Sequence, residues 1–121
     1  MTCVLVVEDD PDIRESLVDI LDNAGYRVLA AEDGQQALRV LDGSTKPDVI
    51  VLDLMMPVMN GYEFRALQRN HPEYGSIPVI VVSADAHARE KAADLGAAAI
   101  LIKPVKVKPL LELIGNVATR S

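Results

Sequence analysis

The feature that most constrains the fold is an unbroken run of branched apolar residues at positions 49–52, which ends in the carboxylate of Asp53. A short Val/Ile/Leu run of this kind is typical of a strand with both faces buried in a parallel sheet. Pro57 and Gly61 mark the loop and the helix start that follow. Open α/β sheets bind their ligands at the carboxyl ends of the strands, so Asp53 should lie where chemistry takes place.

Strand-like and helix-like patterns alternate along the whole chain. The other expected strands are Cys3–Val7, Arg27–Ala31, residues 77–82 and Ala99–Ile102. The expected helices cover residues 11–24, 33–41, 60–70, 86–95 and 107–118. This alternation predicts one domain over residues 1–121 with a doubly wound, flavodoxin-like (βα)5 fold of the α/β class. Its five parallel strands would have the order 2-1-3-4-5, with helices on both faces.

Two of the predicted helices have features that bear on function. The helix at residues 60–70 is expected to bury Phe64 and Leu67 on its apolar face. The helix at residues 86–95 is rich in alanine and charge and has few large apolar side chains. We therefore expect this helix to pack loosely.

The composition is that of an acidic globular protein. The chain has 121 residues, 50 % of them hydrophobic, and its formal net charge of −6 argues against binding to nucleic acid or an anionic membrane. Cys3 is the single cysteine, so it cannot form an intrachain disulfide. No run approaches the roughly 18 apolar residues of a membrane span. These properties predict a soluble, cytoplasmic protein.

Polar side chains follow four of the predicted strands and should meet at one edge of the sheet. They are Glu8, Asp9, Asp53, Ser83 and Lys103. Three crowded carboxylates repel one another unless a cation or a proton neutralises them, and oxygen ligands of this kind suit Mg²⁺. A carboxylate nucleophile, a metal, a lysine and a hydroxyl together predict a phosphoryl-transfer site.

Four motifs in this chain resemble the receiver domain of two-component response regulators, and together they cover essentially its whole length. They are Glu8-Asp9-Asp10-Pro11, the segment from Asp53 to Gly61, Ser83-Ala84 and Lys103-Pro104. The resemblance is to the stand-alone, single-domain type. It implies a signalling switch that promotes only its own phosphorylation and dephosphorylation, not an enzyme with a separate substrate.

The resemblance also implies a role for each residue. Asp53 would accept a phosphoryl group from a phosphohistidine of a sensor histidine kinase or a histidine phosphotransfer protein. Asp9 directly, Glu8 through water, Asp53 and the backbone carbonyl of Met55 would hold Mg²⁺, with Mn²⁺ as an alternative. Ser83 would be the switching hydroxyl. Lys103 would pair with the carboxylate and then with the phosphoryl group, and its bond to Pro104 would be cis.

The chain departs from the family pattern at positions that usually transmit the signal. Ile100 stands where an aromatic residue is often found, and Val105 replaces a frequent Phe, so a readout by an aromatic rotamer is not expected. Met55 and Asp85 occupy positions that tune phosphate lifetime. The surface around residues 84–110 should change on phosphorylation and control a partner protein or a domain outside these residues. The protein should be a monomer or a phosphorylation-dependent dimer.

Two other functional classes compete with this reading. A metal-dependent phosphatase with an aspartate nucleophile would have a general acid two residues later, where this chain has Met55. A flavodoxin-like flavin or nucleotide binder would have a Gly/Ser/Thr-rich loop after the first strand, where Glu8, Asp9 and Asp10 would repel phosphate. Asp10 and Asp12 are explained by helix N-terminal charge and are left out of the metal site.

Overall fold

The computed structural model describes residues 2–43, 45–54, 60–84 and 87–119. Strands and helices alternate, with the bounds β1 Cys3–Val7, α1 Pro11–Asn23, β2 Arg27–Ala31, α2 Gly34–Leu41, β3 Val49–Asp53, α3 Gly61–Arg69, β4 Val79–Ser83, α4 Ala88–Asp94, β5 Ala99–Ile102 and α5 Val107–Thr119. The strands pair in parallel in the order β2-β1-β3-β4-β5. The predicted doubly wound α/β fold and its strand order are therefore confirmed.

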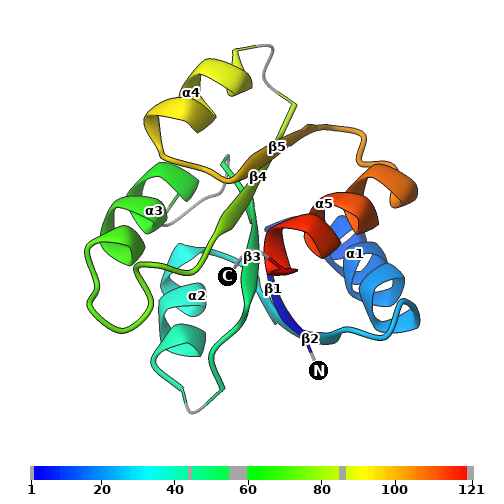
Figure 1. Ribbon diagram of the computed structural model, residues 1–121, viewed down its shortest axis with the longest axis horizontal. Coiled ribbons are helices and arrows are strands. Elements are labelled where there is room, and N and C mark those ends of the chain that lie inside the picture. The colour runs from blue at the N-terminus through cyan, green and yellow to red at the C-terminus, as the bar shows by residue number, and fades with distance from the viewer. Residues whose placement is uncertain (1, 44, 55–59, 85–86, 120–121) are drawn as a thin grey trace.

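The sheet forms a middle layer, with α1 and α5 on one face and α2, α3 and α4 on the other (Figure 1). All residues of β1, β3 and β4 are buried because helices cover both of their faces. Successive side chains of a strand point to opposite faces. Val4 and Val6 accordingly pack in the core with α1 and α5, while Leu5 and Val7 pack in the core with α2 and α3.

Local capping interactions start two helices directly after the carboxyl edge of the sheet. The side chain of Asp10 accepts hydrogen bonds from the backbone N–H groups of Asp12 and Ile13 at 2.9 and 3.2 Å, and Pro11 is the first residue of α1. Asn60 and Glu63 form a capping box at the start of α3. These caps satisfy backbone donors that a helix start leaves open. They hold both helix starts close to the ends of the strands.

Three predicted details differ in the structure. Leu67 is 52 % exposed, not buried, because α3 turns Phe64, Arg65 and Gln68 toward the protein interior. The strand predicted for residues 77–82 begins only at Val79, since Pro78 has no N–H with which to extend the ladder. The helix predicted for residues 86–95 covers Ala88–Asp94, and residues 85–86 lie outside the described part of the chain.

Arg65 ties α3 to the end of α4. Its Nε donates to the carbonyl of Leu95 at 2.9 Å, its Nη2 donates to the carbonyl of Gly96 at 3.1 Å, and its Nη1 donates to Gln68. Gln68 donates in turn to the carbonyl of Tyr74 at 2.7 Å. Burial, and to a lesser extent the charge of Arg69, lowers the pKa of Arg65. The C-terminal end of α4 is thus held by a buried polar network.

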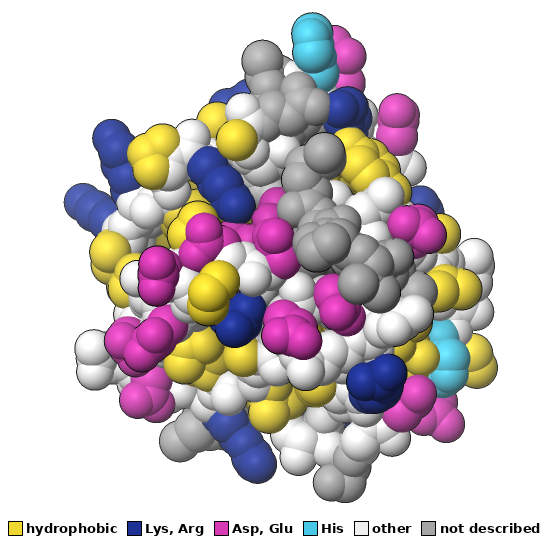
Figure 2. All heavy atoms as spheres, turned by 180° about the vertical axis from the view of Figure 1, so that it is seen from behind, with side chains coloured by type: hydrophobic (Ala, Val, Ile, Leu, Met, Phe, Trp, Pro, Cys, Tyr) yellow, Lys and Arg dark blue, Asp and Glu magenta, His cyan; other side chains and the backbone are white. Residues whose placement is uncertain are grey.

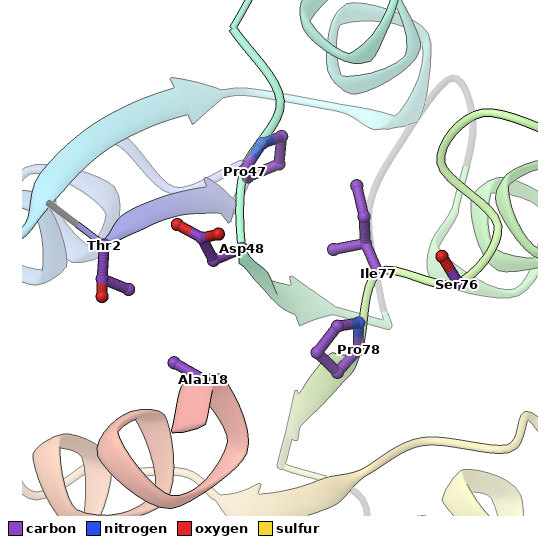
Figure 3. Close-up of a pocket in the computed structure, with 7 residues that line it drawn as sticks. All are labelled: Thr2, Pro47, Asp48, Ser76, Ile77, Pro78 and Ala118. Atoms are coloured by element: carbon purple, nitrogen blue, oxygen red, sulfur yellow. The ribbon is translucent and has the colours of Figure 1, made fainter. Parts of the chain in front are cut away.

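A pocket of about 410 Å³ opens at the amino edge of the sheet, where the chain enters β1, β3 and β4 (Figure 3). Its lining residues are Thr2, Pro47, Asp48, Ser76, Ile77, Pro78 and Ala118. The Asp48 carboxylate accepts a hydrogen bond from the backbone N–H of Cys3 at 2.7 Å. This carboxylate therefore has a structural role in joining the loop before β3 to β1.

Within the described residues, no helix has both the length and the apolar character needed to cross a bilayer.

Candidate functional site

The topology brings the predicted site residues to the carboxyl edge of the sheet. Glu8 follows β1, Asp53 is the last residue of β3, Ser83 is the last residue of β4, and Lys103 follows β5. β1 and β3 are neighbours, so the acids from these two strands lie side by side. In the ladder between β3 and β4, Asp53 lies opposite Val82, which places Ser83 one residue further along the neighbouring strand.

Three carboxylates form the centre of this site. Glu8, Asp9 and Asp53 each present one oxygen, and these oxygens lie within 4.8 Å of one another. Glu8 is 1 % exposed and Asp53 is 4 % exposed, whereas Asp9 is half-buried. Figure 2 shows acidic side chains gathered near the middle of one face of the molecule. The structure therefore brings together the three acids on which the metal prediction depends.

Lys103 faces two of these acids. Its Nζ lies 2.8 Å from Oε1 of Glu8 and 3.4 Å from Oδ2 of Asp53. The backbone N–H of Lys103 donates to the carbonyl of Ser83 at 2.9 Å, which joins the end of β5 to the end of β4. The bond between Lys103 and Pro104 is cis, as expected. The lysine thus reaches both acids from a backbone anchored at the same edge.

The electrostatics of the site follow from burial and close charges. Burial raises the pKa of Glu8 most strongly, and the hydrogen bond with Asp53 raises it further, although Lys103 opposes both. For Lys103, burial acts to lower the pKa, but the hydrogen bond with Glu8 and the charge of Asp53 outweigh it, so the pKa is raised. Without a metal, the pKa values of Glu8 and Lys103 are therefore both raised.

The acid cluster fits a hard divalent cation. Mg²⁺ prefers oxygen ligands and keeps several waters, so a few carboxylate oxygens are sufficient protein ligands. Lys103 pairs with two of the three carboxylates, but its single positive charge does not balance all three. A bound cation would offset the remaining negative charge. The predicted ligand from the backbone of Met55 lies outside the described residues, as does Asp85.

The raised pKa of Glu8 predicts how stability depends on pH in the metal-free protein. Since the pKa of Glu8 in the folded state lies above the ordinary value of 4.5, Glu8 holds its proton to higher pH in the folded protein than in the unfolded chain. The contribution of Glu8 to the free energy of unfolding is therefore fully present below pH 4.5. It is lost as the pH rises through the pKa that Glu8 has in the folded protein.

We expect this loss in urea denaturation of the wild-type protein in EDTA between mildly acidic and neutral pH. Glu8→Gln is the matched control, because an amide keeps the shape of the protonated acid and does not titrate. The stability of wild type relative to Glu8→Gln should fall as pH rises. Parallel stability curves for the two proteins would show that the pKa of Glu8 is not raised by folding.

Two further residues contact the site, and sequence reasoning did not assign them to it. Arg14 on α1 donates to the backbone carbonyls of Glu8 and Asp9. Gly61 packs directly against the backbone of Asp53. A sequence signal for Arg14 exists, because a cation near the start of a helix opposes the helix dipole and needs a compensating partner. Gly61 was recognised as a helix start and as the end of the motif that begins at Asp53, but its contact with the backbone of Asp53 was not predicted.

A doubly wound sheet with three acids and a lysine at its carboxyl edge is the arrangement expected of a receiver-type signalling domain. The sequence matches the family model of the response regulator receiver domain over residues 4–115. The chain therefore belongs to the response regulator receiver domain family. Members of this family are signalling switches of two-component systems and are phosphorylated by sensor kinases. Membership favours this class over the phosphatase and flavin-binding alternatives.

Individual relatives agree with this assignment. The transcriptional regulatory protein CpxR of Klebsiella pneumoniae is 36 % identical over 124 residues, which cover 100 % of this chain and 51 % of CpxR. Protein PilH of Pseudomonas aeruginosa is 34 % identical over 119 residues, which cover 97 % of this chain and 98 % of PilH. The chain thus spans about half the length of CpxR but nearly all of PilH.

Solved structures show the same fold. The chemotaxis response regulator CheY4 of Vibrio cholerae has a TM-score of 0.88 at 33 % identity, and the match covers 97 % of this chain and 98 % of CheY4. The response regulator TrrA of Thermotoga maritima, in complex with Mg²⁺ and BeF, has a TM-score of 0.85 at 30 % identity. That match covers 97 % of this chain and 99 % of TrrA.

Proposed function

We propose that residues 1–121 form one receiver domain in which Asp53 accepts a phosphoryl group in a Mg²⁺-dependent reaction. The observation that carries this proposal is the position of the Lys103 ammonium group, 2.8 Å from Glu8 and 3.4 Å from Asp53, beside an acid cluster that includes Asp9. The Mg²⁺ and BeF in TrrA support the same chemistry. Mn²⁺ is the alternative metal.

The residues divide the work of phosphoryl transfer between them. A carboxylate oxygen of Asp53 forms a bond to phosphorus while the bond to a phosphohistidine nitrogen breaks, and the electron pair leaves on the imidazole. Lys103 pairs with one transferring oxygen, and the hydroxyl of Ser83 donates to another. Glu8 (through water), Asp9, Asp53 and the carbonyl of Met55 would hold Mg²⁺, which supplies further charge stabilisation. Hydrolysis of the acyl phosphate resets the switch.

The direct test is phosphorylation with a small acyl phosphate. Wild-type protein incubated with Mg²⁺ and the acyl phosphate should gain one phosphoryl group, detected by mass spectrometry of the intact protein. The group should be labile to both acid and base, as an acyl phosphate is. EDTA should prevent the reaction. Labelling that persists at full rate in EDTA would exclude the metal-dependent mechanism.

We propose that the phosphodonor is a sensor histidine kinase or a histidine phosphotransfer protein, and that it docks beside the site. A groove of about 550 Å³ with a largely apolar lining runs from Lys103 along α1. Its lining residues are Asp12, Ile13, Ser16, Leu17, Ile20, Lys103, Pro104 and Val105. Ile13 is 37 % exposed at this groove, so a partner can bury it without rearrangement of the domain.

Ile13→Asp tests this docking surface. The added charge should slow transfer from a phosphodonor protein about tenfold or more, because burying an unpaired carboxylate against an apolar partner is costly. Labelling by the small acyl phosphate should continue at the wild-type rate, since this donor needs no docking surface. Ile20→Asp, further along the groove, is a second probe. Equal slowing with both donors would indicate damage to the site itself.

We propose that phosphorylation acts through α4 and the surface around residues 84–110. Arg65 holds the carbonyls of Leu95 and Gly96 at the C-terminal end of α4, and Ala92 is a buried apolar residue within the described part of this helix. Hydrogen exchange of the backbone amides should therefore change on phosphorylation more at the start of α4 than at its end. Identical exchange with and without phosphorylation would argue against this output.

The remaining properties are proposals of the same kind. The protein would work in the cytoplasm as a monomer or a phosphorylation-dependent dimer, and would signal to a partner protein rather than bind nucleic acid or membrane itself. Capture from lysate with phosphorylated and unphosphorylated protein would identify that partner. Gel filtration of the same two samples would establish the oligomeric state.

A further inference from the structure

Arg14 connects α1 to the turn that carries the acids of the site. Its Nη1 donates to the backbone carbonyl of Glu8 at 2.9 Å and to that of Asp9 at 3.3 Å. Arg14 is half-buried, and it lies four residues into α1, close to the positive end of the helix dipole. A cation is unfavourable at this end of a helix. The hydrogen bonds from Arg14 to the two carbonyls offset this unfavourable interaction.

Other hydrogen bonds hold the residues on either side of Asp9 in this turn. The backbone N–H of Glu8 donates to the carbonyl of Ala31 at 3.1 Å, which ties Glu8 to β2. Asp10 is held by its own cap on α1. Asp9 lies between these two anchored residues, and Arg14 donates a hydrogen bond to its carbonyl. The guanidinium thus holds the backbone from which the Asp9 side chain extends.

We infer that Arg14 is a positioning residue for the metal site: it holds the backbone of Glu8 and Asp9 so that their carboxylates converge with that of Asp53. This inference rests on the proposed function, in which these acids bind Mg²⁺. Groups that orient metal ligands commonly change metal affinity by 10- to 100-fold when they are replaced. Arg14 does this through the main chain and does not touch the metal itself.

The charge of Arg14 and its hydrogen bonds predict opposite effects on metal affinity. Removing a positive charge near three acids should strengthen binding of a cation by electrostatics alone. Removing the restraint on Glu8 and Asp9 should weaken binding, because the ligands must be ordered when the metal binds. Arg14→Gln removes the charge and shortens the side chain beyond reach of both carbonyls. Its effect therefore distinguishes the two roles by sign.

The experiment measures Mg²⁺ affinity by titration calorimetry on the full 121-residue chain. Arg14→Gln should bind Mg²⁺ roughly tenfold more weakly than wild type. Arg14→Lys, which can still donate to a carbonyl, should recover part of the loss. Backbone amides near Asp9 should exchange faster in metal-free Arg14→Gln than in metal-free wild type. Affinity that is unchanged or tighter in Arg14→Gln would overturn the inference.

Two controls separate positioning from general effects. Arg39→Gln removes the same charge from an exposed position on α2 and should leave Mg²⁺ affinity within twofold of wild type. Leu21→Ala removes a buried side chain from the far end of α1, so it should lower stability without weakening Mg²⁺ binding. Weaker binding in Leu21→Ala would assign the effect of Arg14 to stability and overturn the inference. Wild type that binds no Mg²⁺ would instead overturn the proposed metal site.

Discussion

Asp53→Asn should abolish phosphorylation by a small acyl phosphate, even at saturating Mg²⁺. An amide is not a nucleophile towards phosphorus, and the substitution also removes the charge of one of the three carboxylates that converge at the site. Mass spectrometry of the intact protein should show the phosphorylated species for wild type and only background for the variant. The effect is the largest that we expect of any single substitution.

The fold should survive this substitution, which keeps the result interpretable. Asparagine has nearly the same shape as aspartate, and it removes a charge beside Glu8, whose pKa is raised mainly by burial and further by Asp53. Circular dichroism should therefore be that of wild type. Asp12→Asn is the matched control, because Asp12 is exposed in the first turn of α1 and should label normally. Equal labelling of wild type and Asp53→Asn would show that the phosphoryl group goes elsewhere.

Gly61→Ala should destabilise the protein and slow the phosphorylation of Asp53. A Cβ at position 61 would lie 2.7 Å from the carbonyl oxygen of Asp53 and 2.7 Å from the Cα of Leu54. Both neighbours are backbone atoms at the end of β3, so the clash cannot be relieved by a side-chain rotation. Overpacking of this kind costs about 1–3 kcal/mol of unfolding free energy. We expect relief of the clash to displace the end of β3, which carries the nucleophile Asp53.

Gly115→Ala is the matched control for this prediction. Gly115 lies within α5, and an added Cβ would lie at an ordinary 3.9 Å from the hydroxyl of Tyr26, its one close neighbour in the part of the chain that the structure describes. Replacing a glycine by alanine inside a helix should stabilise the protein by about 0.5–1 kcal/mol. Urea denaturation should thus show opposite shifts for the two variants, and only Gly61→Ala should label slowly. A stable, normally labelled Gly61→Ala would mean that α3 can move away from β3 without cost.

Much of the fold could be predicted from local patterns in the sequence. The run that ends in Asp53 predicted β3 and its end at Asp53, because burial on both faces demands continuous apolar residues. Pro11 and Asn60 predicted where α1 and α3 begin, because helix starts depend on side chains within a few residues. Parallel pairing then implied that Glu8 and Asp53 end at the same edge.

The errors arose where burial depends on a distant part of the chain. Leu67 was expected inside and is exposed, while the polar Gln68 is fully buried. An apolar pattern cannot anticipate this, because Gln68 donates to the carbonyls of Tyr74 and Ile77 in the loop before β4 and accepts a hydrogen bond from Arg65. Polar side chains that hydrogen-bond to the backbone of another element do not recur at helical or strand spacing, so the sequence pattern does not show that they are buried.

The sequence by itself thus determined the order of the elements, the strand that ends in Asp53 and the set of acids, hydroxyl and lysine available for chemistry. Only the tertiary structure decided how those groups are held: Arg14 on the carbonyls behind Glu8 and Asp9, and Gly61 against the backbone of Asp53. The physical reason is the separation along the chain between the residues that interact. Strand burial and helix caps depend on neighbouring residues, whereas the geometry of a site depends on contacts between elements that the chain separates.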